Sequence, residues 1–175
     1  MNTHETLNHI EILDFTPLTI PEKRWGKYHE FRKILHSQRY PDIALETTDE
    51  SVEKGMKLYV EHPEVKGVMF SIMDKSVHKQ VGHILCVIPR KTSETYQENK
   101  GYMEFYINIL ENYHRKGIGT KALTKVFEVA AENEKTLLAT DTYFASGKAF
   151  LQDMGAELEL GIENRLRLDE IDFSK

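Results

Sequence analysis

The chain has 175 residues, of which 40% are hydrophobic and 29% are charged, and this composition is typical of one soluble domain with a hydrophobic core. Its formal net charge of −5 argues against a nucleic-acid partner, because a general nucleic-acid binder carries a basic excess. The single cysteine, Cys86, excludes an intrachain disulfide, and the lack of a transmembrane-length apolar run or a signal-peptide core predicts a cytoplasmic protein without a membrane partner.

The N-terminal third of the chain predicts one strand and two helices. Residues 9–15 alternate like a strand, which stops near Pro17. A helix follows Pro21 and ends by Pro41. Four apolar side chains share one face of this helix: Trp25, Tyr28, Phe31 and Leu35. Thr48 and Asp49 offer capping residues for a second helix. Its apolar side carries Val52, Met56, Tyr59 and Val60.

The middle of the chain predicts three strands. Residues 67–73 and 78–88 are apolar runs, and the polar turn 74–76 between them indicates an antiparallel hairpin. Cys86 lies in the second run, so we expect it to be buried as a small hydrophobic side chain. The polar residues 89–100 predict a surface loop, and residues 102–110 form the third strand of this region.

The remaining elements complete a mixed fold. A helix after residue 117 places five side chains inward: Ala122, Leu123, Val126, Phe127 and Ala130. Residues 136–140 predict a strand, residues 144–154 a helix that Gly155 ends as a C-cap, and residues 157–160 and 165–168 two closing strands. The order β-α-α-β-β-β-α-β-α-β-β predicts an α/β fold, a three-layer mixed arrangement in one domain over residues 1–175.

The strand at residues 102–110 ends in a basic, glycine-containing turn, and an amphipathic helix follows at once. Such a turn aims backbone N–H groups and the positive end of the helix dipole at one point, which binds phosphate. Lys121 follows Thr120 directly, which is not the order of a Walker loop. A Rossmann fingerprint would need its third glycine at Ala122, and alanine is sometimes tolerated there, so this second exclusion is weaker. The turn predicts a phosphate-bearing ligand.

The element order, with His-Arg-Lys-Gly-Ile-Gly-Thr at residues 114–120, resembles the GNAT superfamily of acyl-CoA-dependent N-acetyltransferases. The loop motif of that family is Q/R-x-x-G-x-G/A. Gly117 and Gly119 occupy its two small positions, and His114 stands where Gln or Arg is usual. The resemblance covers nearly the whole chain, and residues 155–172 are also similar to the end of the first domain in tandem GNAT proteins.

The resemblance implies that acetyl-CoA binds as a cosubstrate and that no metal is needed. Backbone N–H groups of the turn would hold the pyrophosphate, and the exposed backbone of the preceding strand would pair with the pantetheine arm. The turn residues implied are His114, Arg115, Lys116, Gly117, Ile118, Gly119 and Thr120. The strand residues implied are Ile107, Asn108 and Ile109.

An acceptor amine attacks a thioester only as the free base, so the site must help to remove a proton. The resemblance implies Glu104 as this base, and His83 on the neighbouring strand is a second candidate. The tyrosine that usually protonates the leaving thiolate maps to Leu151, and an asparagine common near the start of the same helix maps to Phe144. Tyr143 is the remaining candidate for the acid.

The sequence is compatible with three functions. The first is an N-acetyltransferase that moves an acetyl group from acetyl-CoA to a primary amine of a small molecule or peptide by direct attack in a ternary complex. The second is a catalytically weak or inactive acyl-CoA-binding domain with a sensing or partner-binding role, which Leu151 and Phe144 favour. The third is a nucleotide-binding turn. Dimerisation is common in the family, so a homodimer is compatible with the resemblance.

Overall fold

The computed structural model describes residues 7–142 and 145–157. The chain divides into two compact units, Met1–Thr140 and Asp141–Lys175. The predicted strand 165–168, nearly all of the predicted strand 157–160 and the catalytic candidate Tyr143 lie outside the described residues.

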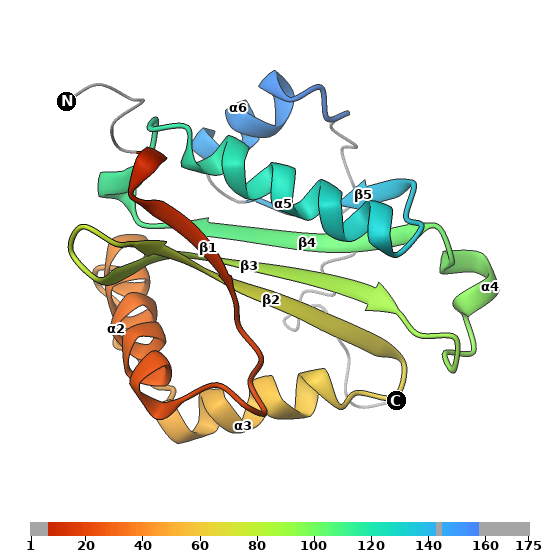
Figure 1. The fold of residues 1–175 in the computed structure, drawn as a ribbon, viewed down its shortest axis with the longest axis horizontal. Helices are drawn as coiled ribbons and strands as arrows, with labels where there is room; N and C mark the ends of the chain where they lie inside the picture. Colours follow the sequence, from red (N-terminus) through yellow and green to blue (C-terminus); the bar gives the residue numbers. More distant parts are fainter. Residues whose placement is uncertain (1–6, 143–144, 158–175) are drawn as a thin grey trace, which may run out of the picture. The chain divides into compact units, whose positions relative to one another are not determined.

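The first unit is built on a five-stranded sheet with the strand order β1-β2-β3-β4-β5 (Figure 1). The strands are β1 (Ile10–Asp14), β2 (Val65–Asp74), β3 (Lys79–Pro89), β4 (Tyr102–Ile109) and β5 (Leu137–Ala139). Neighbours from β1 to β4 are antiparallel, which confirms the predicted β2–β3 hairpin. β5 runs parallel to β4, because a helical crossover connects these two strands.

Helices cover both faces of this sheet. α2 (Glu22–Arg39) and α3 (Asp49–Val60) follow β1, and α5 (Ile118–Glu132) connects β4 to β5. Met69 of β2 packs in a core with Trp25 of α2 and with Tyr59 of α3. The next residue, Phe70, lies under Lys125 of α5, whose Nζ is 5.1 Å from the ring centroid. Because neighbouring side chains of a strand point to opposite faces, α2 and α3 cover one face of the sheet and α5 covers the other.

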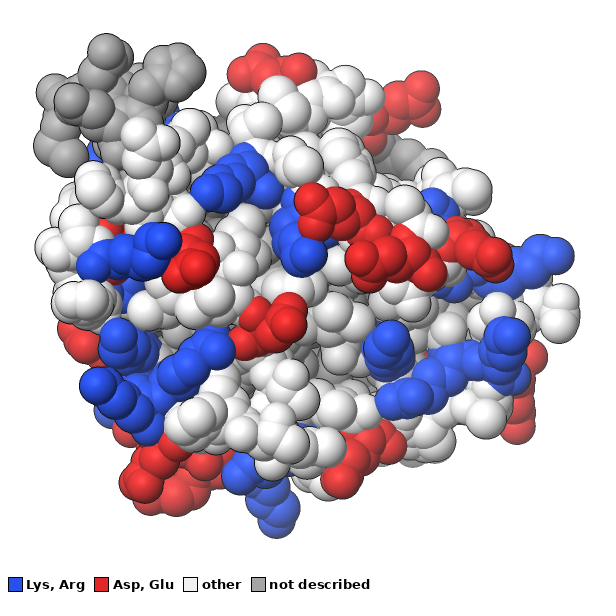
Figure 2. Space-filling model, in the orientation of Figure 1, with Lys and Arg blue, Asp and Glu red and all other residues white. Residues whose placement is uncertain are grey.

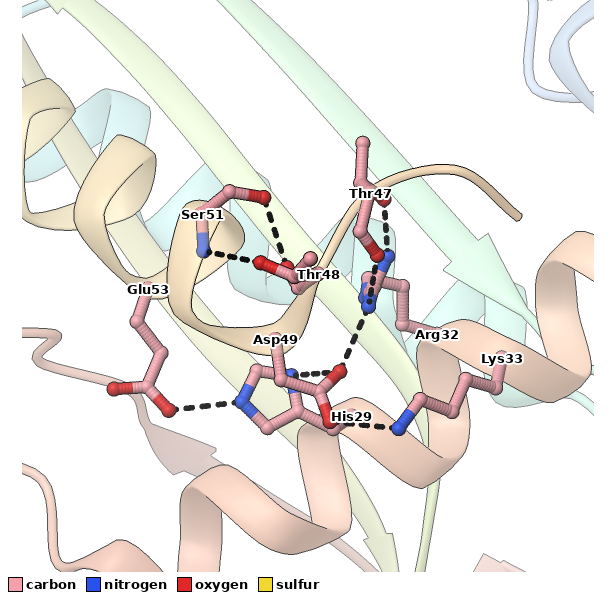
Figure 3. A network of polar contacts seen from close by, with 8 residues as sticks. All are labelled: His29, Arg32, Lys33, Thr47, Thr48, Asp49, Ser51 and Glu53. Carbon is pink, nitrogen blue, oxygen red and sulfur yellow. Dashed lines mark hydrogen bonds and ion pairs between the residues drawn. The ribbon is translucent and has the colours of Figure 1, made fainter.

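A polar network joins α2 to the first turn of α3 (Figure 3). Thr48 caps α3 by accepting a hydrogen bond from the Ser51 N–H at 3.1 Å, as predicted. The Asp49 carboxylate accepts hydrogen bonds from Lys33 at 2.6 Å and from Arg32 at 2.8 Å, and these bonds lower the pKa of Asp49. His29, which is buried, lies between Asp49 and Glu53. The network fixes the start of α3 against α2.

The prediction of which α5 side chains are buried is wrong at one position. Phe127 is 52% exposed, whereas Leu123, Val126 and Ala130 are buried. With 3.6 residues per turn, the buried stripe is centred near Val126, and position 127 lies beyond its edge. Val129, which the prediction left out, is buried instead. The chain therefore tolerates a large exposed aromatic side chain on this helix.

Two further helices are short. α4 (Tyr96–Asn99) lies within the connection that was predicted to be only a loop. α6 (Ala145–Asp153) belongs to the second unit, and Gly155 ends it with a φ of 82°, which confirms the predicted C-cap. In the part of the chain that the structure describes, no helix combines the length and the apolar character needed to cross a membrane.

Candidate functional site

Within residues 7–142 and 145–157, one edge of β4 is unpaired beyond its first three residues. The ladder between β4 and β5 pairs only Tyr102, Met103 and Glu104 of β4. The Leu110 N–H donates to Val81 O at 3.0 Å, so by alternation the backbone groups of Ile107 and Ile109 point away from β3. Among the described residues, no strand pairs with Ile107 and Ile109 on that side. An extended ligand can therefore bind along this edge as an additional strand.

The turn after β4 concentrates N–H donors. A 3₁₀ turn, η1 (Glu111–Tyr113), is followed by two residues in the left-handed region, Arg115 with φ 57° and Gly117 with φ 77°. The Lys121 N–H makes the first bond of α5, to Gly117 O at 3.1 Å. Within the described residues, the backbone N–H groups of 115–120 have no protein acceptor. A left-handed residue before a helix start makes such groups converge on an anion.

Side chains hold this turn in place. His114 Nε2 lies 2.9 Å from Ile109 O, so the imidazole ties the turn to the end of β4. Lys116 Nζ lies 5.1 Å from the ring centroid of Tyr113, and the Tyr113 hydroxyl donates to Asp74 Oδ2 at 3.0 Å. Burial alone would raise the pKa of Asp74, but hydrogen bonds from Ser76 and Tyr113 outweigh it and lower that pKa. The turn is thus anchored to β4 and to the β2–β3 hairpin.

The charges of α5 suit an anion at its start. Figure 2 shows basic side chains over the first half of this helix and acidic ones over its second half. The basic residues in the sequence of α5 are Lys121 and Lys125, and the acidic ones are Glu128 and Glu132. Helices usually carry the opposite arrangement, which complements their dipole. No acidic side chain in the first turn competes with a bound anion.

On β4, Glu104 lies between two tyrosines whose hydroxyl groups both donate to its carboxylate. Its carboxylate accepts a hydrogen bond from the Tyr102 hydroxyl at 3.0 Å through Oε1, and one from the Tyr106 hydroxyl at 3.2 Å through Oε2. Burial and the Glu104 carboxylate raise the pKa of Tyr102 to about 12. Burial and the charge of Glu104 also raise the pKa of Tyr59 on α3. Glu104 therefore faces α3, and Tyr102 stays a hydrogen-bond donor at neutral pH.

The structure separates His83 from Glu104. His83 pairs with Asn108 and Glu104 with Val87, so the two residues lie four positions apart along the ladder, about 13 Å. His83 is buried, with ring centroids of Tyr28 at 5.2 Å and Phe15 at 5.8 Å. Burial lowers the pKa of His83 to about 4. This environment favours a packing role over proton transfer.

Two further contacts at the site are not predicted by the sequence. The end of α2 is joined to the end of β4, because Arg39 Nη2 donates to Asn108 Oδ1 at 2.6 Å and the Glu111 N–H donates to Gln38 Oε1 at 3.2 Å. No local pattern predicts these long-range bonds. The row of Tyr102, Glu104 and Tyr106 was detectable, because alternate residues of a strand share a face.

The second unit holds the residues that replace the usual acid. Leu151 is half-buried on α6, and Ser146 and Lys148 are exposed there. Tyr143 and Phe144 lie outside the described residues. No group of three or more potential metal ligands occurs within residues 7–142 and 145–157.

A mixed sheet with an open strand edge, leading into an N–H-rich turn and a helix, defines a protein class that binds an extended, phosphate-bearing cofactor. The model of the acetyltransferase (GNAT) family matches residues 28–156, which is 129 of the 175 residues. The chain belongs to the GNAT acetyltransferase family, a family that uses acetyl-CoA.

Solved structures share the fold at low sequence identity. An acetyltransferase of Trypanosoma brucei is 10% identical with a TM-score of 0.62, over 86% of this chain and 94% of its own. Glucosamine-6-phosphate N-acetyltransferase of Arabidopsis thaliana is 15% identical with a TM-score of 0.61, over 95% and 97%. An aminoglycoside N-acetyltransferase in complex with CoA is 15% identical with a TM-score of 0.59, over 91% and 95%. Comparison with curated protein sequences finds no match.

Proposed function

We propose that this protein transfers an acetyl group from acetyl-CoA to a primary amine of a small molecule or peptide, by direct attack in a ternary complex. The observation that carries the proposal is the continuity of the open β4 edge at Ile107 and Ile109 with the N–H-rich turn. An edge strand suits the amide groups of a pantetheine arm, and the turn suits a pyrophosphate at the end of that arm.

The proposed cofactor residues divide by the part of acetyl-CoA that they hold. The pantetheine arm would lie along Ile107, Asn108 and Ile109. The backbone of Ile107 and the N–H of Ile109 would supply the hydrogen bonds, because Ile109 O already contacts His114, and Asn108 contributes by its contact with Arg39. The pyrophosphate lies in the turn. The turn residues are His114, Arg115, Lys116, Gly117, Ile118, Gly119 and Thr120.

Glu104 is the proposed general base, and Tyr143 the proposed acid. The ammonium group of the acceptor must lose a proton before its nitrogen attacks the thioester carbonyl, and Glu104 is a carboxylate on the strand that carries the cofactor edge. Tyr143 would protonate the coenzyme A thiolate.

The neighbours named for aminoglycosides and glucosamine 6-phosphate support a small amine as the acceptor. We also propose a cytoplasmic location.

The test is coenzyme A release by the purified chain from acetyl-CoA with a panel of primary amines. Glu104→Gln is expected to lower kcat/KM by about a hundredfold, which is typical for loss of a general base, without a change in acetyl-CoA affinity. Glu98→Gln, at an exposed position of α4, is the matched control and is expected to behave like the wild type. Unchanged turnover in Glu104→Gln would remove Glu104 from the mechanism.

A second function is an acyl-CoA-binding domain without turnover. The observation that favours it is the apolar pair Leu151 and Phe144, where family members often carry polar residues. This alternative predicts tight acetyl-CoA binding by calorimetry, no coenzyme A release with any amine of the panel, and the same biological effect for the wild type and for Glu104→Gln.

A further inference from the structure

Both oxygens of the Glu104 carboxylate are already engaged by phenols of its own strand. Tyr102 donates to Oε1 at 3.0 Å and Tyr106 to Oε2 at 3.2 Å. The three side chains alternate along β4 and therefore share the face that α3 covers. On that face, burial and the charge of Glu104 raise the pKa of Tyr59 of α3. A proton that reaches this carboxylate along either hydrogen bond passes through a phenolic oxygen.

The two tyrosines differ in their position relative to the open edge. Tyr102 is paired with Leu137, and Glu104 with Ala139 is the last pair between β4 and β5. Tyr106 lies two residues beyond that pair, a rise of about 6.7 Å, and directly precedes Ile107, whose backbone faces the open edge. The proposed function puts the pyrophosphate in the turn and the pantetheine arm along residues 107–109, so the thioester would lie at the end of the arm away from the turn, beside Ile107. Of the two phenols, Tyr106 is the nearer to that position along the strand.

We propose that Tyr106 is a catalytic residue that relays the proton of the acceptor ammonium to Glu104. The inference rests on the proposed function, since it assumes an acetyl group beside Ile107. One N–H bond of the ammonium breaks and its proton binds the Tyr106 oxygen, while the original Tyr106 proton moves to Glu104 Oε2. Tyr102 donates to the other oxygen, Oε1, and takes no part in this transfer.

The rest of the reaction balances without a further reagent. The freed lone pair of the nitrogen forms a bond to the thioester carbonyl carbon, and the C–S bond breaks as the tetrahedral intermediate collapses. The nitrogen loses a second proton, the coenzyme A sulfur takes up one proton, and Glu104 releases its proton to water. The products are the amide, coenzyme A and one proton.

The experiment compares two classes of acceptor that differ in whether the attacking amino group is protonated at pH 7. The probes are primary alkylamines, which are ammonium ions at pH 7, and aminooxy compounds of the same chain, whose amino groups are neutral at that pH. Tyr106→Phe keeps the ring and removes only the hydroxyl. We expect kcat/KM of Tyr106→Phe to fall by about a hundredfold for alkylamines and by less than about threefold for their aminooxy counterparts.

Tyr102→Phe is the matched control, because it removes a phenol that binds the same carboxylate but lies on the paired part of β4. It is expected to retain kcat/KM within about threefold for both classes of acceptor. Equal losses for alkylamines and aminooxy compounds in Tyr106→Phe would overturn the relay, since a merely structural role affects both classes. A larger loss in Tyr102→Phe than in Tyr106→Phe would also overturn it.

The relay and the proposed function fail in different ways. If the wild type releases no coenzyme A with any acceptor, both are overturned. If the wild type is active and Glu104→Gln is impaired while Tyr106→Phe retains full activity on alkylamines, the relay alone is overturned and Glu104 acts directly. Calorimetric titration measures the acetyl-CoA affinity of Glu104→Gln and Tyr106→Phe. We expect this affinity to be unchanged in Tyr106→Phe, and a loss of affinity in a variant would show that its cofactor site is damaged.

Discussion

At the scale of single residues, His83 shows how burial decides the chemistry of an ionisable group. Its imidazole packs against the rings of Phe15 and Tyr28, and within the described residues its buried Nδ1 has no hydrogen-bond partner. A charged imidazole there would lose its hydration, and a hydrogen bond with the backbone of Phe70 offsets only part of that loss. Burial accordingly lowers the pKa of His83 to about 4, and the residue stays neutral in the folded protein at neutral pH.

This burial makes stability depend on pH. In the unfolded chain His83 takes up a proton near its ordinary pKa of 6.5, whereas in the folded chain it does so near 4. Between these values the unfolded state binds more protons, so the free energy of unfolding falls as the pH is lowered through this window, by about 3 kcal/mol at most. We expect His83→Phe to lack this part of the pH dependence in urea unfolding followed from pH 7 to pH 4.

The carboxylates of Asp49 and Asp74, whose pKa values are lowered, lose their stabilising effect at lower pH and remain in the variant. The difference between the wild type and His83→Phe therefore isolates the imidazole. His9→Gln, at an exposed position, is expected to keep the wild-type slope. Identical slopes for the wild type and His83→Phe would contradict the buried neutral imidazole.

At the scale of elements, the start of α5 departs from what stability alone would select. Arg115 is a non-glycine residue in the left-handed region, which costs on the order of 1 kcal/mol. The helix also carries its basic residues early and its acidic residues late, against its dipole. Such departures from local preference are expected at a functional site. His78 and Glu134 are also in the left-handed region, but among the described residues only Arg115 lies beside a helix start with unpaired N–H groups.

Substitution by alanine is expected to have opposite effects on stability at two glycines of this chain, Gly117 and Gly55. At Gly117, φ is 77° and a Cβ would lie 3.1 Å from Leu7 Cδ1. We expect Gly117→Ala to lower the free energy of unfolding by on the order of 1 kcal/mol and to weaken acetyl-CoA binding by about tenfold. Urea unfolding and calorimetric titration with acetyl-CoA measure the two effects.

Gly55→Ala is the matched control. Gly55 lies inside α3, and nothing is within 4 Å of the Cβ that alanine would add. Alanine is the better helix former, so this variant is expected to gain up to about 1 kcal/mol of stability with unchanged cofactor affinity. Unchanged acetyl-CoA affinity in Gly117→Ala would show that the cofactor does not approach this backbone.

At the scale of the whole molecule, a ligand that binds only the folded state stabilises it. Acetyl-CoA at about a hundred times its Kd is expected to add about 2.7 kcal/mol. For a protein of this size that is a rise in Tm of about 5–10 °C. A thermal shift with acetyl-CoA, coenzyme A and ATP at equal concentration measures the effect. A larger shift with ATP than with acetyl-CoA would favour the nucleotide-binding alternative.

Much of the fold followed from local patterns, and the errors have a common cause. Alternation and capping signals predicted the β2–β3 hairpin, the N-cap at Thr48 and the C-cap at Gly155, because each depends on residues close in sequence. Phe127 was assigned to the core because hydrophobicity was taken as burial. Its exposure depends on where the sheet lies relative to the helix stripe, which no local pattern specifies.

The sequence by itself determined the chemistry of the turn, since the basic residues and Gly117 and Gly119 are contiguous and their backbone donors need no distant partner. Only the tertiary structure decided which edge of β4 is open, because the short β5 pairs no further than Glu104. It also decided that His83 is buried and that Tyr106 meets Glu104. These properties depend on the packing of segments distant in the chain, and burial and hydrogen-bond geometry exist only once those segments have met.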